Sequence, residues 1–211
     1  VRRPVAASRH GRRRLKSMAR LVFIAGHAGT GKTTLARRAV PLLHARTGES
    51  FCVLDKDTVY GAYSAKVMGL LTGDPDDRDS PTYLEHLRDQ EYAGLLEIAA
   101  ENLALGVNVV LVGPFSREVK SKRVFDPAAL GAPPGTRISV VWVALDEATA
   151  KARIVARGDA RDRYKLAHWD DYRKRRFDPD PAEFPALLRF DNAAFDEAAF
   201  ERLVATICRE P

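Results

Sequence analysis

The stretch Gly26-His27-Ala28-Gly29-Thr30-Gly31-Lys32-Thr33 decides how this chain folds, because it fits the pattern G-x-x-x-x-G-K-[ST] at every fixed position. An apolar run, Leu21–Ala25, precedes it, and a helix-forming run, residues 34–39, follows it. Strand, loop and helix in this order are the setting in which the pattern binds phosphates, which disfavours a glycine-rich turn that binds nothing. The stretch therefore predicts a site for a nucleoside triphosphate.

Each position of this phosphate loop has an expected role. Its glycines allow a tight turn that brings backbone N–H groups close to phosphate oxygens, and the following helix adds its partial positive charge. Lys32 would reach the outer phosphates, and the Thr33 hydroxyl would ligate Mg²⁺. We expect ATP and Mg²⁺ as the bound species. The expected nucleotide-binding residues are Gly26, His27, Ala28, Gly29, Thr30, Gly31, Lys32, Thr33 and Thr34.

The composition is that of an ordinary globular protein, with its excess charge gathered at one end. The 211 residues are 45% hydrophobic and 29% charged, and the net charge is +6. Residues 1–20 hold eight basic side chains and no acid, which leaves 26 basic and 28 acidic residues in the remainder. We expect 1–17 to be a disordered basic leader or a cloning remnant, and 18–211 to be a single domain. The near-neutral body disfavours a nucleic-acid partner.

Apolar runs alternate with helical patterns after the leader. This alternation predicts βαβ units, and hence a five-stranded parallel sheet with helices on both faces, in three α/β/α layers. One helix, residues 58–71, carries apolar side chains on one side, namely Val59, Tyr60, Tyr63, Val67 and Leu70 or Leu71. The expected strands are 21–25, 51–54, 107–112, 138–145 and 187–190, and the expected helices are 32–43, 58–71, 80–105, 146–157 and 194–208, with 116–135 irregular.

Two carboxylates, Asp55 and Asp57, follow the second expected strand. Because ligands bind at the carboxyl ends of parallel strands, one is expected to orient the metal ion and the other to accept a proton from a substrate hydroxyl. The third strand ends Val112-Gly113-Pro114 and offers no carboxylate. We assign Asp55 to the metal together with Thr33, and Asp57 to the proton, although the two roles remain interchangeable and either residue could merely cap a helix.

Three arginines, Arg153, Arg157 and Arg161, recur at intervals of four residues after the fourth strand. On one helix they would share a face, and with Gly158 as a hinge they suit a lid that closes over phosphates and excludes water. The alternative is a solvated helix that pairs its arginines with Glu147, Asp159 and Asp162.

Taken together, these motifs resemble those of the small P-loop (AAA_33-like) kinases, the group that contains gluconate kinase, chloramphenicol phosphotransferase, the zeta toxins and polynucleotide kinase. The features shared are the phosphate loop, Asp-x-Asp after strand two, Gly113-Pro114-Phe115 after strand three and the arginine-rich lid over 157–177. The resemblance implies a nucleoside-kinase-like fold with a lid. It also implies that Lys32, Asp57, Arg157 and Arg161 are catalytic, and that Arg153 and Asn192 bind the nucleotide.

The resemblance leaves the acceptor open, because its members differ by substrate over the segment equivalent to 58–105. That segment holds only Lys66, Arg78 and Arg88 as lysine or arginine, which favours a hydroxylated or cationic acceptor over a nucleoside monophosphate. A sugar, a nucleoside or an antibiotic remain open. The acceptor-side candidates are Asp57, Tyr60, Arg88, Tyr92, Phe115 and Arg117.

The sequence thus favours an ATP-dependent phosphotransferase with an alcohol group as acceptor (EC 2.7.1.-). The alternatives are an ATPase or switch protein without such an acceptor, and a kinase that acts on a nucleotide sugar or a polynucleotide end. We expect a cytoplasmic monomer or homodimer with no membrane partner, since no apolar run approaches the roughly 20 residues of a membrane span.

Overall fold

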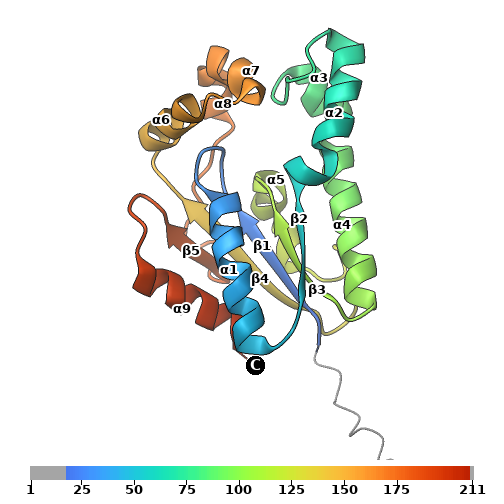
Figure 1. The fold of residues 1–211 in the computed structure, drawn as a ribbon, viewed down its shortest axis with the longest axis vertical. Coiled ribbons are helices and arrows are strands. Elements are labelled where there is room, and N and C mark those ends of the chain that lie inside the picture. The colour runs from blue at the N-terminus through green and yellow to red at the C-terminus, as the bar shows by residue number, and fades with distance from the viewer. Residues whose placement is uncertain (1–17, 210–211) are drawn as a thin grey trace, which may run out of the picture.

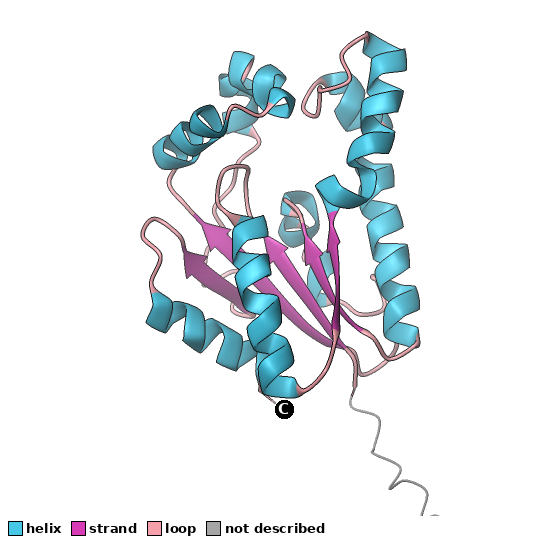
Figure 2. Ribbon diagram, viewed as in Figure 1, coloured by secondary structure: helices cyan, strands magenta, loops and turns pink. Residues whose placement is uncertain are grey.

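A parallel sheet of five strands forms the centre of the computed structural model, which describes residues 18–209 (Figures 1 and 2). The basic leader expected over 1–17 lies outside the described residues. The strand order is β2-β3-β1-β4-β5, and each neighbouring pair is parallel. The predicted fold class is confirmed. The strands are β1 (Arg20–Ala25), β2 (Phe51–Asp55), β3 (Asn108–Val112), β4 (Arg137–Ala144) and β5 (Leu187–Asp191).

Helices connect the strands and cover both faces of the sheet. The helices α1 and α9 lie on one face and α4 on the other, while α6, α7 and α8 stand beyond the carboxyl ends of the strands (Figure 1). The helices are α1 (Lys32–Thr47), α2 (Lys56–Thr72), α3 (Pro81–His86), α4 (Arg88–Ala104), α5 (Ser116–Lys120), α6 (Glu147–Arg157), α7 (Arg163–Ala167), α8 (Trp169–Lys174) and α9 (Glu197–Cys208), with 3-10 turns η1 (Arg123–Phe125) and η2 (Ala160–Asp162).

The central strand shows why the sheet must be covered twice. Leu21 and Phe23 of β1 pack into the core beneath α4, whereas Val22 and Ile24 pack beneath α1 and α9. Successive side chains of a strand point to opposite faces, so a strand that is apolar at every position requires a helix layer on each side. This is the physical origin of the three layers.

The single helix predicted over 80–105 is two helices in the structure. Ser80 caps α3 as predicted, by accepting a hydrogen bond from the backbone N–H of Tyr83. The chain then turns at Leu87, because Tyr83 and Leu87 pack on Met68 of α2 while α4 packs on the sheet. Likewise, a short helix, α5, stands in the segment 116–135 that was expected to be irregular.

The expected apolar face of α2 is only partly buried, because Tyr60 and Val67 pack against apolar clusters whereas the other members of that face do not. Tyr63 and Leu70 are exposed, and the helix instead buries Ser64 and Met68. The burial of a serine here has a polar cause, because its hydroxyl donates to the buried carboxylate of Glu91 on α4.

The lid arginines do not share one helix, contrary to the spacing argument. The helix α6 ends at Arg157, since Gly158 adopts the left-handed conformation with φ 62° and turns the chain away. Arg161 therefore stands in the 3-10 turn that follows. Among residues 18–209, no helix is both long enough and apolar enough to cross a membrane.

Candidate functional site

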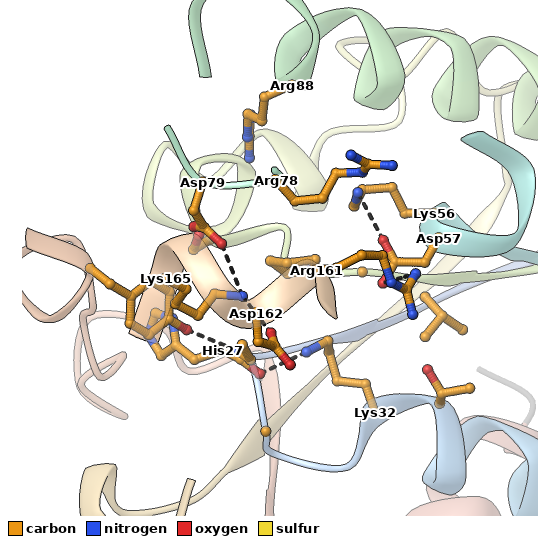
Figure 3. A pocket seen from close by; sticks show the side chains of 18 of the residues that line it. His27, Lys32, Lys56, Asp57, Arg78, Asp79, Arg88, Arg161, Asp162 and Lys165 are labelled. Carbon is orange, nitrogen blue, oxygen red and sulfur yellow. Dashed lines mark hydrogen bonds and ion pairs between the residues drawn. The ribbon is translucent and has the colours of Figure 1, made fainter. Parts of the chain in front are cut away.

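A cavity of about 580 Å³ opens at the carboxyl ends of β1, β2 and β3, and the phosphate loop forms one of its walls (Figure 3). Most of the loop lines it, from His27 to Gly29 and from Gly31 to Thr34. Gly26 and Thr30 shape the loop instead. A Cβ on Gly26, whose φ is 138°, would lie 2.6 Å from the carbonyl oxygen of Val143, so only glycine fits there. The Thr30 hydroxyl donates to the carbonyl oxygen of His27 at 2.9 Å.

Lys32 places its ammonium inside the loop. Its Nζ donates to the carbonyl oxygen of His27 at 2.7 Å. Burial lowers the pKa of Lys32 to about 7, against the nearby carboxylate of Asp57, which raises it. A cation held in partly desolvated surroundings interacts strongly with any anion that enters, so this ammonium suits a phosphate group.

Thr33 and Asp55 meet at the start of α1, as the metal-site prediction requires. The Thr33 hydroxyl donates to Oδ2 of Asp55 at 2.9 Å, and Oδ1 of Asp55 accepts the backbone N–H of Asp57 at 2.9 Å. Asp55 is thus both the cap of α2 and the partner of Thr33. A hydroxyl and a carboxylate oxygen are ligands that Mg²⁺ accepts, and this ion is commonly held by one or two protein oxygens together with phosphates.

Asp57 lies in the first turn of α2 and lines the same cavity as the phosphate loop. Its Oδ1 lies 2.9 Å from Nζ of Lys56, and its Oδ2 lies 3.8 Å from Arg161 of the lid. Although burial opposes it, the charge of Lys56 and then that of Arg161 lower the pKa of Asp57 below its usual value. Asp57 is therefore an ionised carboxylate at neutral pH.

A buried polar network, which the sequence analysis did not predict, holds Lys56, the ion-pair partner of Asp57. Nζ of Lys56 donates to Glu91 at 3.0 Å and to the Tyr83 hydroxyl at 3.2 Å. Glu91 also accepts from the hydroxyls of Tyr83, at 2.5 Å, and of Ser64. Lys56 and Glu91 are both more than nine-tenths buried, so this ion pair is fully hydrogen-bonded and rigid. The sign of this network in the sequence was Lys56, which stands between the candidate site residues Asp55 and Asp57.

The lid arginines line the cavity and are at the same time paired within the lid. Arg157 donates to both oxygens of Asp162 at 2.6 and 2.8 Å, and Arg161 donates to Asp159 at 2.6 and 3.0 Å. The pairing with Asp159 and Asp162 agrees with the alternative interpretation of this segment, whereas Glu147 binds Trp169 instead, and the contact of the arginines with phosphates stays a prediction. Both guanidiniums are about half exposed, whereas Asp162 is buried and would keep Lys165, at 3.0 Å, as its partner if Arg157 moved to a phosphate.

Ion pairs join the lid to the loop between α2 and α3. Asp79 on this loop binds Lys165 of α7 at 2.9 Å and Arg175 at 3.2 Å, and Figure 3 shows Lys165 reaching toward Asp79. The pair Asp79–Lys165 is largely buried, whereas the neighbouring pair between Asp76 and Arg163 is exposed. The lid is thus closed over the cavity chiefly through Asp79.

We predict that Asp79→Asn loosens the lid. The substitution removes one of the two carboxylates that Lys165 faces, the other being Asp162 of the lid itself, and loss of a buried charged partner costs on the order of 1–3 kcal/mol. Amide hydrogen exchange over 163–175 should therefore accelerate by about tenfold or more. The matched control is Asp76→Asn, whose exposed ion pair is worth up to about 1 kcal/mol. Equal acceleration in both variants would contradict the assignment of closure to Asp79.

His27 ties the phosphate loop to the segment that returns from the lid. Its Nε2 lies 2.7 Å from the carbonyl oxygen and 3.1 Å from the backbone nitrogen of Phe177, and its ring meets Trp142 edge-on at 5.2 Å. Burial lowers the pKa of His27 to about 4, a shift to which Arg176 adds. The ring is therefore neutral at physiological pH.

A pH dependence of stability follows from His27. Between pH 6.5 and about 4 the unfolded chain binds a proton at this histidine that the folded chain does not, so stability falls as the pH is lowered, by about 1.4 kcal/mol per unit. Urea unfolding measures the free energy of unfolding at pH 6.5 and at pH 4.5. The decrease between these two pH values should be about 2 kcal/mol smaller in His27→Gln than in the wild type. The exposed His86→Gln should behave as the wild type. Parallel curves for His27→Gln and the wild type would refute this role.

Asn192 and Arg153 lie beside the phosphate loop, where nucleotide-binding residues were expected. Asn192 donates its side-chain amide to the carbonyl oxygen of Thr30 at 2.7 Å, and Arg153 donates to the carbonyl oxygen of Asn192 at 2.9 Å. Arg153 lines the cavity. The loop after β5 is thereby fixed against the phosphate loop.

The acceptor-side candidates divide into two groups. Arg88, Tyr92 and Arg117 line the cavity together with Asp57, whereas Phe115 is fully buried in the core and Tyr60 points to Gly94 of α4. Arg88 is engaged within the protein: its guanidinium binds both oxygens of Glu118 at 2.7 and 2.8 Å and stacks 3.9 Å from the Tyr92 ring.

Comparison with known proteins gives the same architecture. A family model, AAA_33, described as an AAA domain, matches residues 21–179. A sequence comparison with curated proteins finds no match. Among solved structures, a sugar kinase from Janibacter sp. HTCC2649 is 18% identical over 91% of this chain and 99% of its own, with a TM-score of 0.58.

Two further solved structures share the fold. A gluconokinase from Sinorhizobium meliloti 1021 is 16% identical over 90% of this chain and 91% of its own, with a TM-score of 0.53. Kti12 from Chaetomium thermophilum, in complex with ADP-AlF3, is 18% identical over 89% of this chain and 96% of its own, with a TM-score of 0.60. Identities this low establish a P-loop kinase-like fold and leave the reaction to the site itself.

Proposed function

This chain belongs to the AAA_33 family of AAA domains, and we propose that it is an ATP-dependent kinase that transfers the γ-phosphoryl group to a hydroxyl of a small acceptor. In this proposal, 58–105 contributes the acceptor-binding helices and 157–177 the lid of a single domain spanning 18–211. The fold shared with a sugar kinase and a gluconokinase supports the proposal.

The position of Asp57 is the observation that carries the proposal. This carboxylate lines the same cavity as Lys32 of the phosphate loop and Arg161 of the lid, and it stands in front of the helices α3 and α4. A carboxylate at the border between a phosphate site and a second compartment is suited to a substrate hydroxyl. The third strand ends without a carboxylate, at Val112 and Gly113, where a hydrolase would orient its water.

The chain's own residues supply positioning and charge. Lys32 neutralises charge on the transferred phosphoryl group, and Arg157 and Arg161 do so from the lid after they leave their carboxylate partners. Asp57, ionised because of Lys56, accepts the proton of the acceptor hydroxyl as the oxygen attacks phosphorus in line with the leaving ADP. Closure of the lid through Asp79 excludes water, which would otherwise take the phosphoryl group.

Mg²⁺ fits the pair formed by Thr33 and Asp55. When bound, this ion would neutralise charge on the β- and γ-phosphates. Among the described residues no group of three or more histidine, cysteine or acidic side chains forms a cage for a metal ion. We therefore expect the ion to arrive with the nucleotide, and the Thr33 hydroxyl and the Asp55 carboxylate to hold it directly or through water.

The test is ATP turnover with and without a panel of hydroxylated acceptors, with phosphorylated product detected by mass spectrometry. Without an acceptor we expect only slow ATP hydrolysis. With an accepted compound we expect ATP turnover to rise at least about a hundredfold, since a positioned acceptor with its base contributes about 10²–10⁴-fold. Steady hydrolysis that every acceptor leaves unchanged would favour the ATPase or switch function instead.

A further inference from the structure

The acceptor end of the cavity is formed by elements that lie far apart in the sequence. We define this end by Arg78 and Tyr83, from the α2–α3 loop and α3, and by Arg117 and Lys120, from α5. In Figure 3, Arg78 lies on the far side of Asp57 from Lys32. A molecule bound here would present one of its groups to Asp57 and another to these side chains.

Nearly every charged group around this end already has a partner of opposite charge. Asp57 is paired with Lys56, and Asp79 with Lys165 and Arg175. The other pairs are Arg88 with Glu118 and Arg117 with Asp89. Among the described lining carboxylates, Asp55 alone has no ion pair, and it is engaged by the Thr33 hydroxyl and the backbone N–H of Asp57 on the phosphate-loop side.

Two cations at the acceptor end face no carboxylate. Arg78 donates only to backbone carbonyl oxygens, those of Gly61, Pro75 and Asp77, at 2.7 to 3.0 Å. Lys120 makes no hydrogen bond or ion pair with any of residues 18–209, although it lines the cavity. Arg117 donates to Asp89 through one terminal nitrogen, NH1, at 3.0 and 3.2 Å. A surplus of positive charge thus faces the space beyond Asp57.

We propose that the acceptor is a hydroxyl compound bearing a carboxylate or a phosphate, and that Lys120 and Arg78 bind this anionic group while Asp57 receives the hydroxyl. The proposal rests on the kinase function and names its substrate class. Charge-assisted hydrogen bonds to an oxyanion are the strong ones, and two cations from different elements, the α2–α3 loop and α5, can fix orientation as well as affinity. The proposed class keeps the hydroxylated acceptor expected from 58–105 and replaces the cationic alternative with an anionic group, because α5 lies outside that segment.

Lys120 is the residue to test, because no described residue depends on it for a contact. The probes are glucose, glucosamine, gluconate and glucose 6-phosphate, and separately adenosine and its 5′-monophosphate, with Mg·ATP for transfer and a non-hydrolysable ATP analogue for binding by calorimetry. We expect the anionic members to exceed their neutral partners in kcat/KM by about tenfold or more. Comparing gluconate with glucose 6-phosphate separates a carboxylate from a phosphate.

Lys120→Ala should raise KM for the anionic compounds about tenfold with kcat little changed, and Lys120→Arg should restore it. Lys66→Ala, on the exposed side of α2, is the matched control. Preference for the neutral or cationic members, equal effects of Lys120→Ala on both classes, or failure of all anionic members to bind at millimolar concentration would overturn the proposal. Anion binding that depends on Lys120 without any transfer would uphold it while refuting the kinase function.

Discussion

Lys32→Ala is expected to nearly abolish phosphoryl transfer, lowering kcat by a factor of about 10²–10³, and to weaken ATP binding as well. The Lys32 ammonium is held within the phosphate loop by the carbonyl oxygen of His27, in surroundings that lower its pKa to about 7. A cation placed in this way stabilises charge on the transferred group, and loss of a single such donor costs about 10²–10³-fold in other enzymes. The measurements are single-turnover transfer and calorimetric titration with ATP.

The control for Lys32→Ala is Lys66→Ala, which removes an exposed lysine of α2 outside the cavity. It should retain wild-type rates and affinity. Removal of Lys32 also relieves a buried charge, so the variant should unfold at the same temperature as the wild type or higher. Wild-type turnover in a folded Lys32→Ala protein would show that the loop does not act on the nucleotide.

Asp57→Asn is expected to reduce transfer by about 10²–10⁴-fold while ATP still binds with near wild-type affinity. Asparagine keeps the shape of the side chain but neither accepts a proton nor pairs with the charge of Lys56. The loss should appear in kcat with no rescue at higher pH, because the carboxylate that it replaces is already ionised at neutral pH. Stopped-flow transfer and calorimetry separate the two effects.

Glu85→Gln, on the exposed face of α3, is the control for the removal of a nearby negative charge. The contrast with Asp55→Asn separates the two carboxylates. Asp55 contacts Thr33, so its loss should shift the concentration of Mg²⁺ needed for half-maximal activity. A wild-type rate in Asp57→Asn, or a Mg²⁺ shift of equal size in both variants, would refute the assignment of Asp57 as the proton acceptor.

The fold could be predicted from the sequence because its signals are local. The phosphate loop, the capped helices and the strands that are apolar on both faces are each specified by a few consecutive residues. A parallel sheet covered by helices is the arrangement that buries such strands. Signals that depend on packing were wrong or incomplete. The helix predicted over 80–105 breaks at Leu87, because its two halves pack on different partners.

The same limit applies to the site. The sequence alone determined the phosphate loop, the carboxylates after β2 and the arginines of the lid, because strand ends and loop patterns fix those positions locally. Only the tertiary structure decided that Asp55 meets Thr33, that Glu91 holds Lys56 behind Asp57, and that Lys120 lines the same cavity as Lys32. These contacts join segments far apart in the chain, and their geometry depends on how whole helices pack against the sheet, which no short pattern of residues encodes.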